Sequence, residues 1–262
     1  MTISLPTESS VALISAIRAF IDDTDSHRRQ PLKRWQRLIG WINWGLNVQP
    51  LLRPALQSCY AKISGKTHPH AGVSLNRDVR RDLEWIASIF QRHTGVHVLR
   101  SRIWHATEAD LTIFCDASLS GMGFWSPQMN SGFCCDCPAI PEDVPAGCIF
   151  WYEALTVLAA LEWAATLQPP PRRLAIFSDN MNTVQIFDSL RATTGYNKVL
   201  LSACDILISS DIDLRVWHIP GTTNTIADAL SRGLLSVAHQ YAPTLQIFTF
   251  IPPRCTLGAS PS

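Results

Sequence analysis

The sequence predicts a mixed α/β domain, a sheet flanked by helices, preceded by a mainly helical segment. Residues 111–126 carry two short apolar runs joined by Ser-Leu-Ser-Gly, which indicates an antiparallel hairpin. Residues 152–219 alternate helical and strand patterns, which is typical of strands linked by helices. Residues 1–105 show only helical periodicity. Together these patterns favour one mixed sheet in the second part of the chain.

Length and composition set the bounds of this prediction. The chain has 262 residues, of which 47% are hydrophobic, so it can bury a core in one large domain or two small ones. Charged residues make up only 16%, below the roughly 25% usual in soluble domains, and there are nine tryptophans. Some apolar surface is therefore expected to face a missing partner, and we expect the chain to be a fragment.

Neither a membrane span nor a secretion signal is predicted. The longest apolar stretches are interrupted by Arg18 and Glu162. Eight cysteines without a secretory signal fit a reducing compartment better than a disulfide framework. We expect an intracellular protein, cytoplasmic or nuclear, that is not secreted and has no membrane partner.

The N-terminal elements are predicted from apolar stripes. A helix is predicted over residues 7–23, with Thr7 as N-cap, and its apolar stripe consists of Val11, Ile14, Ile17 and Ile21. Two helical segments follow between 31 and 63, separated near Pro50 and Pro54, and their stripe consists of Trp35, Leu38, Ile39 and Ile42. Residues 75–93 form a further predicted helix.

The second part of the chain supplies five predicted strands. They are residues 111–116, 121–126, about 146–151, 174–179 and 213–219. Helices are expected at 152–167, 182–190, 198–209 and 225–235. The expected organisation is thus a helical segment over 1–105, the α/β domain over 106–235 and a Pro-containing tail over 236–262.

The net charge of +1 conceals an asymmetry between the two parts. Residues 1–105 hold 15 Lys and Arg against 7 Asp and Glu, and the remainder holds 7 against 14. A basic part can neutralise phosphates, whereas an acidic part is suited to divalent cations.

Four acids fall at ends of predicted elements. Asp116 and Asp179 end apolar strands, Glu153 opens the long helix, and Asp228 opens the last one. Since carboxyl ends of parallel strands share one edge of a sheet, Asp116 and Asp179 are expected side by side. Glu153 shares the apolar helix face and points inward, whereas Glu162, nine residues later, lies half a turn away.

Four converging carboxylates without Lys or Arg partners would repel one another unless divalent cations neutralise them. Mg²⁺ prefers such oxygen ligands, and Mn²⁺ is an alternative. Two ions about 3.5–4 Å apart could support in-line phosphodiester hydrolysis. The competing interpretation is that each acid is only a helix cap or a solvated strand end. The apolar frames around Asp116 and Asp179 favour a functional role.

Four stretches resemble, in order and spacing, the acidic motifs of the ribonuclease H domain of retrotransposon reverse transcriptases. They are LTIFCDASLSGMGFW, WYEALTVLAALEWA, LAIFSDN and VWHIPGTTNTIADALSR. The Ser-Asp-Asn and HIPG forms are most similar to DIRS-like elements, with gypsy-like elements next. The resemblance implies a ribonuclease-H-like five-stranded sheet and an endonuclease that cuts the RNA strand of RNA:DNA hybrids.

The resemblance implies Asp116, Glu153, Asp179 and Asp228 as the metal-binding catalytic acids. Asp116 and Asp179 would bind both ions, Glu153 one ion, and Asp228 the other. His218, ten residues before Asp228, corresponds to a histidine that helps product release or relays a proton in related domains, although an ordinary half-buried histidine fits equally well.

Upstream, residues 3–20 and 32–63 resemble the end of a polymerase palm and the thumb or connection region. The family places the polymerase portion before these segments, so that portion is an expected partner. Phe20-Ile21-Asp22-Asp23 mimics the polymerase signature but closes a helix, so we expect no polymerase activity from this chain alone.

Further residues could contact nucleic acid. Asn224 could cap the last helix or touch substrate, with capping favoured; Ser118, Gly121 and Asn180 flank the acids, where turn chemistry competes with backbone contacts. The basic residues of the first part could hold a duplex backbone or simply form a solvated helix face; they are Arg28, Arg29, Lys33, Arg34 and Arg37. The cluster Cys134-Cys135-Asp136-Cys137, with Cys148, lacks a second spaced pair, so edge-strand thiols are favoured over zinc.

Two other functions fit the same sequence. A chain that begins inside a thumb-like segment could be an inactive nucleic-acid-binding remnant. The same fold could also serve a nuclease that acts on DNA, such as an integrase or a junction nuclease.

Overall fold

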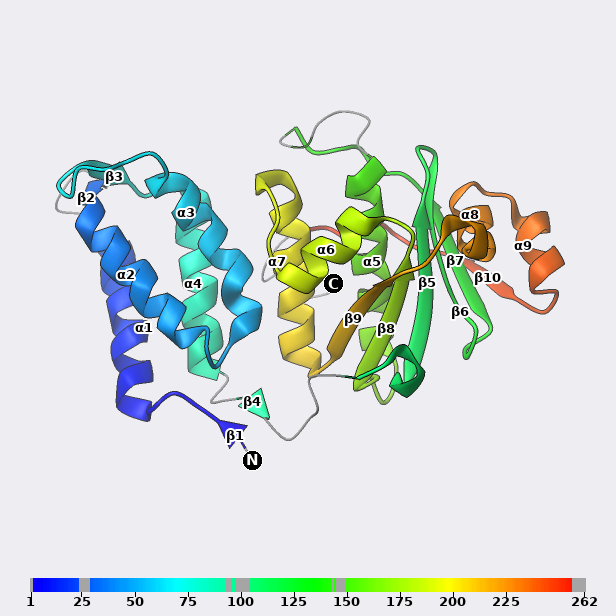
Figure 1. Cartoon of the computed structure of the whole chain (residues 1–262), viewed down its shortest axis with the longest axis horizontal. Helices are drawn as coiled ribbons and strands as arrows, with labels where there is room; N and C mark the ends of the chain where they lie inside the picture. The colour runs from blue at the N-terminus through cyan, green and yellow to red at the C-terminus, as the bar shows by residue number, and fades with distance from the viewer. Residues whose placement is uncertain are drawn as a thin grey trace. The chain divides into compact units, whose positions relative to one another are not determined.

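A computed structural model of the chain describes residues 2–23, 29–92, 96–97, 104–142, 144 and 149–255. The chain divides into two compact units, Met1–Arg102 and Ile103–Thr256 (Figure 1). No helix within the described ranges is both long and apolar enough to cross a bilayer.

The N-terminal unit is built from helices and two short strand pairs. Its helical segments are α1 (Thr7–Asp22), α2 (Leu32–Gly45), η1 (Pro50–Leu56), α3 (Gln57–Ile63) and α4 (Arg77–Arg92). The strand pairs are β1 (Thr2–Ile3) with β4 (Val96–His97), and β2 (Arg29–Pro31) with β3 (Gly72–Ser74). The helices predicted over 7–23, 31–63 and 75–93 are therefore present.

The face that α1 buries differs from the predicted stripe. Leu13, Ile17, Phe20 and Ile21 are buried, whereas Val11 is 61% exposed. Phe20 meets Trp35 of α2 edge-to-face, with ring centroids 5.1 Å apart, so packing against the other helices selects the buried face. The predicted Thr7 cap is wrong, because Pro6 holds the N-cap position without a side-chain bond.

The C-terminal unit contains a six-stranded mixed sheet flanked by helices, which confirms the predicted class. Its strands are β5 (Leu111–Ala117), β6 (Gly121–Ser126), β7 (Ser131–Asp136), β8 (Arg173–Ser178), β9 (Asp213–His218) and β10 (Gln246–Thr249). The order is β10-β7-β6-β5-β8-β9. β7, β6 and β5 are antiparallel neighbours, whereas β5, β8 and β9 run parallel and β10 runs parallel to β7.

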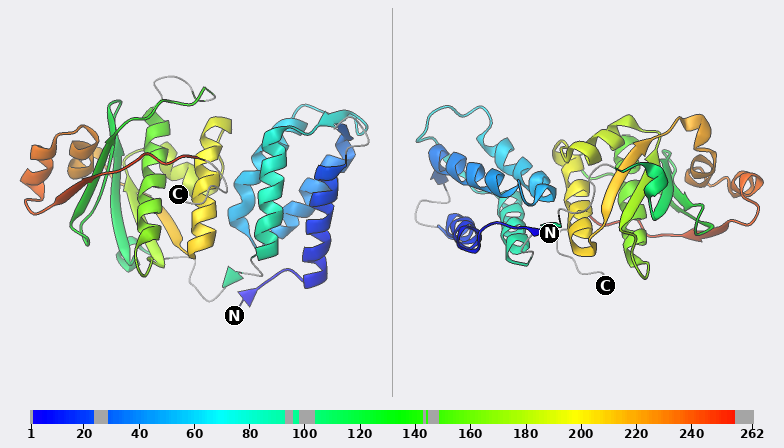
Figure 2. Two further views of the ribbon diagram at one scale, coloured as in Figure 1. Left: turned by 180° about the vertical axis from the view of Figure 1, so that it is seen from behind. Right: turned by 60° about the horizontal axis from the view of Figure 1, so that its bottom comes forward.

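Helices cover both faces of this sheet. The helical segments of this unit are η2 (Ala106–Glu108), α5 (Ile149–Thr166), α6 (Met181–Ser189), α7 (Thr194–Ser210), η3 (Gly221–Thr223), α8 (Thr225–Ser231) and α9 (Leu235–Tyr241). Phe124 of β6 packs on Trp163 of α5, while the alternate residues Gly121 and Gly123 meet α8. Because side chains alternate along a strand, α5 and α8 lie on opposite faces. In Figure 2, left, α5 and α7 lie in front of the sheet.

Two strand predictions were wrong. The third strand is β7, Ser131–Asp136, and not residues 146–151, because Ile149 already begins α5. β10 adds a sixth strand to the five expected. Residues 236–262, expected as a tail, include most of α9 and all of β10, and Ala238 and Leu245 pack with Leu230 in the core. This apolar burial stabilises the packing of α9 and of the start of β10 beside α8.

Candidate active site

Three predicted acids converge at one edge of the sheet. β5 and β8 are parallel and in register up to Phe114 and Phe177, so Asp116 in β5 and Asp179 just after β8 reach the same edge. Glu153 approaches from α5. One carboxylate oxygen from each acid lies within 4.8 Å of the others. Within the described residues, these acids are the one cluster of three or more groups suited to a metal ion.

Glu153 is held from two sides. Its Oε1 accepts a hydrogen bond from the Ala117 amide at 3.3 Å, and its Oε2 accepts one from the Ser178 hydroxyl at 3.4 Å. The residue is only 4% exposed, and its helix neighbours Val157 and Ala160 are fully buried. The predicted inward direction of Glu153 is confirmed.

Asp116 and Asp179 are supported differently. Asp116 is 4% exposed, and its Oδ2 accepts a hydrogen bond of 2.5 Å from the Ser231 hydroxyl in α8. Asp179 is half-buried and lies against Gly221, where a Cβ atom would come within 2.8 Å of Asp179 Oδ2. The glycine of the HIPG stretch thus leaves room for the Asp179 carboxylate.

The cluster carries more negative charge than its surroundings balance. Burial raises the pKa of Glu153 to about 9, with the neighbouring Asp116 and Asp179 adding to the rise. Burial also raises the pKa of Asp116 to about 7; the Ser231 hydrogen bond opposes this rise, and Asp179 and Asp228 reinforce it. Unpaired carboxylates in this position favour either protons or a bound cation.

The donor set fits a hard divalent cation. It consists of carboxylate oxygens, which Mg²⁺ and Mn²⁺ accept, and it contains no thiolate or imidazole. Its two buried members are bonded to hydroxyl and amide donors, which leave the negative charge uncompensated. The residues present therefore fit a magnesium site.

Asp228 stands apart from the other three acids. Its carboxylate accepts a hydrogen bond from Arg232 Nε at 2.7 Å, one helical turn away, and the side chains of Arg232 and Asp228 are 55% and 42% exposed. Its charge still contributes to the raised pKa of Asp116, so it lies near the cluster. The expectation that none of the acids has a basic partner is corrected for Asp228.

The interpretations of His218 and Asn224 change with the structure. His218 ends β9 and is exposed, so the half-buried alternative is wrong. Asn224 is 2% exposed and makes no side-chain cap; its Nδ2 donates to the Cys115 carbonyl at 2.8 Å, which ties α8 to β5. The favoured capping role is therefore wrong, because its amide turns toward the strand.

The small residues that flank the acids organise turns. Asn180 caps α6 through hydrogen bonds from the amides of Asn182 and Thr183. The Ser118 hydroxyl accepts from the Gly121 amide at 3.0 Å and lies 2.8 Å from the Ser231 carbonyl. Ser118 is only 6% exposed. Contact of these residues with nucleic acid stays a prediction.

The predicted basic residues belong to the N-terminal unit, and Arg28 lies outside the described residues. Arg29, Lys33 and Arg37 are exposed. Arg34 pairs with Asp23 and donates to Gln30 Oε1 at 2.7 Å, so this cation already has partners.

The thiol cluster forms no metal site among the described residues. Cys134 and Cys135 lie on β7, and Cys137 follows it; Cys148 lies outside the described part. Burial raises the pKa of Cys135 to about 12 and that of Cys137 to about 11, which disfavours thiolate ligands.

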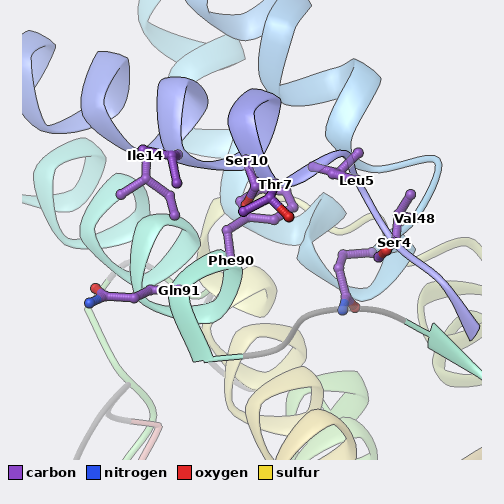
Figure 3. A pocket seen from close by; sticks show the side chains of 10 residues that line it. Ser4, Leu5, Thr7, Ser10, Ile14, Val48, Phe90 and Gln91 are labelled. Carbon is purple, nitrogen blue, oxygen red and sulfur yellow. The ribbon is translucent and has the colours of Figure 1, made fainter.

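A pocket of about 260 Å³ opens in the N-terminal unit (Figure 3). Its walls come from the start of α1, from Val48 and Gln49, and from Phe90 and Gln91 at the end of α4. The lining holds serine, threonine and glutamine beside apolar side chains but no acid, base or thiol. It offers no chemistry comparable with the acid cluster.

Ser231 and Gly221 support the acids but were missed from sequence. The one available signal for Ser231 is its place three residues after Asp228, on the same side of a helix. Gly221 has no local signal, because its role depends on the carboxylate of a distant residue.

Comparison with known proteins finds similarity in structure only. No protein-family model matches the chain, and no curated protein sequence matches it. Ribonuclease H1 from the halophilic archaeon Halobacterium salinarum is 18% identical, covering 48% of this chain and 97% of its own, with a TM-score of 0.37. The N-terminal ribonuclease H domain of rv2228c from Mycobacterium tuberculosis is 16% identical, covering 51% and 99%, with a TM-score of 0.35.

A foamy viral protease-reverse transcriptase in complex with double-stranded DNA is 14% identical. The match covers 82% of this chain and 41% of the viral one, with a TM-score of 0.29.

Proposed function

We propose that this protein is a metal-dependent ribonuclease H, an endonuclease that hydrolyses the RNA strand of RNA:DNA hybrids. The observation that carries the proposal is the meeting of Asp116, Glu153 and Asp179 within 4.8 Å at the carboxyl ends of parallel strands. The sequence resemblance to retrotransposon reverse transcriptases, DIRS-like or gypsy-like, supports the choice of substrate.

Asp116, Glu153 and Asp179 would hold Mg²⁺, with Mn²⁺ as a substitute, and Asp228 would complete the ligands of a second ion. With two such ions bound, these acids would place the charge that activates a water and that stabilises the leaving oxygen of an in-line phosphodiester hydrolysis. The hydrogen bonds from Ala117 and Ser178 keep the Glu153 carboxylate turned toward the two aspartates. Asp228 would take part once its partly exposed ion pair with Arg232 opens, which would cost at most about 1 kcal/mol.

His218 is the proposed proton relay. It ends β9 opposite Ser178, the residue that precedes Asp179, and it is exposed. A neutral imidazole carries one nitrogen that can accept a proton and one that can donate it. This position lets His218 reach a leaving group at the same edge of the sheet.

The N-terminal unit is proposed as a thumb or connection segment. Its exposed Arg29, Lys33 and Arg37 would contact phosphates without regard to sequence. A polymerase portion of a reverse transcriptase is the proposed protein partner.

The proposal is tested by incubating the chain with a labelled RNA:DNA hybrid, with and without Mg²⁺. We expect metal-dependent cutting of the RNA strand, reduced more than about 100-fold in Asp179→Asn. Glu162→Gln is the matched control, because Glu162 is half-buried in α5 but outside the cluster, and it should cut normally.

Other outcomes separate the rival functions. Binding of the hybrid without cutting would support an inactive remnant. Preferential cutting of DNA duplexes or junctions would support a nuclease that acts on DNA. Either result overturns the hybrid nuclease.

A further inference from the structure

We propose that Ser231 is a positioning residue that fixes the Asp116 carboxylate for cation binding, an inference that rests on the proposed function. Ser231 is 1% exposed and donates its hydroxyl hydrogen to Asp116 Oδ2 at 2.5 Å. These two residues are 115 positions apart in sequence. Their meeting therefore depends on how α8 is seated on the sheet.

Two glycines of β6 lie against the backbone of Ser231. A Cβ atom on Gly123 would lie 2.6 Å from the Ser231 amide nitrogen, and one on Gly121 would lie 2.7 Å from the Ser231 carbonyl oxygen. Gly123 is also the direct partner of Asp116 in the β5–β6 register. The missing side chains thus let the end of α8 approach the strand beside the acid.

A hydrogen bond from Ser118 also holds the Ser231 backbone beside β6. The Ser118 hydroxyl lies 2.8 Å from the Ser231 carbonyl and also accepts a hydrogen bond from the Gly121 amide. The β5–β6 turn and the end of α8 are joined through this one hydroxyl. These contacts hold the backbone amide and carbonyl of Ser231. The hydroxyl of Ser231 is therefore placed to donate a hydrogen bond to Asp116.

The Ser231 hydroxyl has one hydrogen and two nearby acceptors, Asp116 Oδ2 and the Asp228 carbonyl at 2.9 Å. A charged carboxylate is the stronger acceptor, so the hydrogen goes to Asp116. This bond restrains rotation of the carboxylate, so that one of its oxygens stays within 4.8 Å of an oxygen of Glu153 and of Asp179. Without the hydroxyl, a buried acceptor would lose its partner and the carboxylate could turn.

The test measures cation binding directly. Mg²⁺, and separately Mn²⁺, are titrated calorimetrically into the full chain, its Ser231→Ala variant and a Ser126→Ala control. Ser126 is buried in the same sheet, with its hydroxyl 3.3 Å from Gln128, and it touches none of the acids. We expect Ser231→Ala to bind about 10- to 100-fold more weakly and Ser126→Ala to bind as the unchanged chain does.

Two readouts separate positioning from a merely structural role. Thermal unfolding without metal should show Ser231→Ala folded, and the effect of Ser231→Ala on cation affinity should vanish in an Asp116→Asn background. Equal affinity of folded Ser231→Ala and the unchanged chain would overturn the inference. If Ser231→Ala does not fold, the isosteric Ser231→Cys, a weak donor, should still lower the affinity; unchanged affinity there would also overturn it.

Failure of the proposed function gives a different result. If the unchanged chain binds neither cation, the metal-dependent nuclease fails. If the unchanged chain binds cations and cuts hybrids while folded Ser231→Ala binds equally well, only the role of Ser231 fails.

Discussion

Each unit buries aspartate, but the two units compensate its charge differently. In the N-terminal unit, Asp82 of α4 is 1% exposed and accepts hydrogen bonds from Arg81 Nε at 3.0 Å and Nη2 at 2.7 Å. In the C-terminal unit, Asp116 and Glu153 are each 4% exposed and receive only hydroxyl and amide donors. The guanidinium partly compensates the charge of Asp82 within the fold. The charges of Asp116 and Glu153, which lie close together, need a bound cation for the same compensation.

The largest expected effect is a pH-dependent loss of stability in the metal-free protein. The pKa of Asp116 is raised from 3.8 to about 7 and that of Glu153 from 4.5 to about 9. Between the unfolded and folded values the folded state binds more protons, so the stabilisation is complete below about pH 4 and is lost as the pH rises through 7 and 9.

Chemical denaturation at several pH values measures this effect. The free energy of unfolding should fall by several kcal/mol from pH 4 to 9 relative to the double variant Asp116→Asn/Glu153→Gln. Saturating Mg²⁺ should restore stability at high pH in the unchanged chain and not in the double variant. Equal pH profiles for the two proteins would contradict the unbalanced cluster.

The next effect compares the two buried aspartates directly. Asp82→Asn should destabilise the N-terminal unit by about 2 kcal/mol, because a neutral amide oxygen accepts the two hydrogen bonds from Arg81 more weakly than a buried carboxylate does. Asp116→Asn should leave the metal-free C-terminal unit unchanged or more stable, because repulsion from Asp179 and Glu153 is relieved. Urea unfolding without metal measures both, and equal destabilisation would erase the contrast.

Two glycine substitutions give a smaller effect of opposite sign. Gly123→Ala would place a Cβ atom 2.6 Å from the backbone of α8 and should cost about 1–3 kcal/mol. Gly40→Ala, in the middle of α2 with no atom within 4 Å of the new Cβ, should stabilise by about 0.5–1 kcal/mol. Thermal unfolding distinguishes the signs, and a neutral Gly123→Ala would mean that α8 does not rest on that glycine.

The smallest effect concerns the pair that accompanies Asp228. Arg232→Gln removes an exposed i,i+4 ion pair and should change the free energy of unfolding by less than about 1 kcal/mol. Removal of a cation beside the acids should also tighten Mg²⁺ binding a few-fold. Weaker binding in Arg232→Gln would show that the guanidinium supports the site instead of competing for Asp228.

The sequence pattern predicted correctly those elements that depend only on residues close together in the chain. The hairpin of residues 111–126 was evident from two apolar runs and a turn, and the face of Glu153 followed from helical period. The same reasoning failed at residues 146–151, because a short apolar run does not distinguish the first turn of a helix from a strand. β7 was missed as a strand, although edge-strand thiols were favoured for its cysteines, because the run SGFCCD contains no β-branched residue.

The Asp228–Arg232 pair was within reach of the sequence, since its i,i+4 spacing is a known helix contact. The direction of the Asn224 side chain was not, because its bond to the Cys115 carbonyl spans 109 positions. The strand β10 could not be predicted from sequence either, because it is only four residues long and forms by pairing with β7.

The sequence by itself determined where the acids stand on their elements, because strand and helix periods depend only on neighbouring residues. Only the tertiary structure decided that Asp116, Glu153 and Asp179 share one site. It also decided that Asp228 lies near this site in an ion pair with Arg232. The contact between Ser231 and Asp116 likewise depends on two glycines of β6 that let α8 approach the strand. The physical reason is that strand register and the seating of a helix on a sheet are set by packing between segments far apart in the chain.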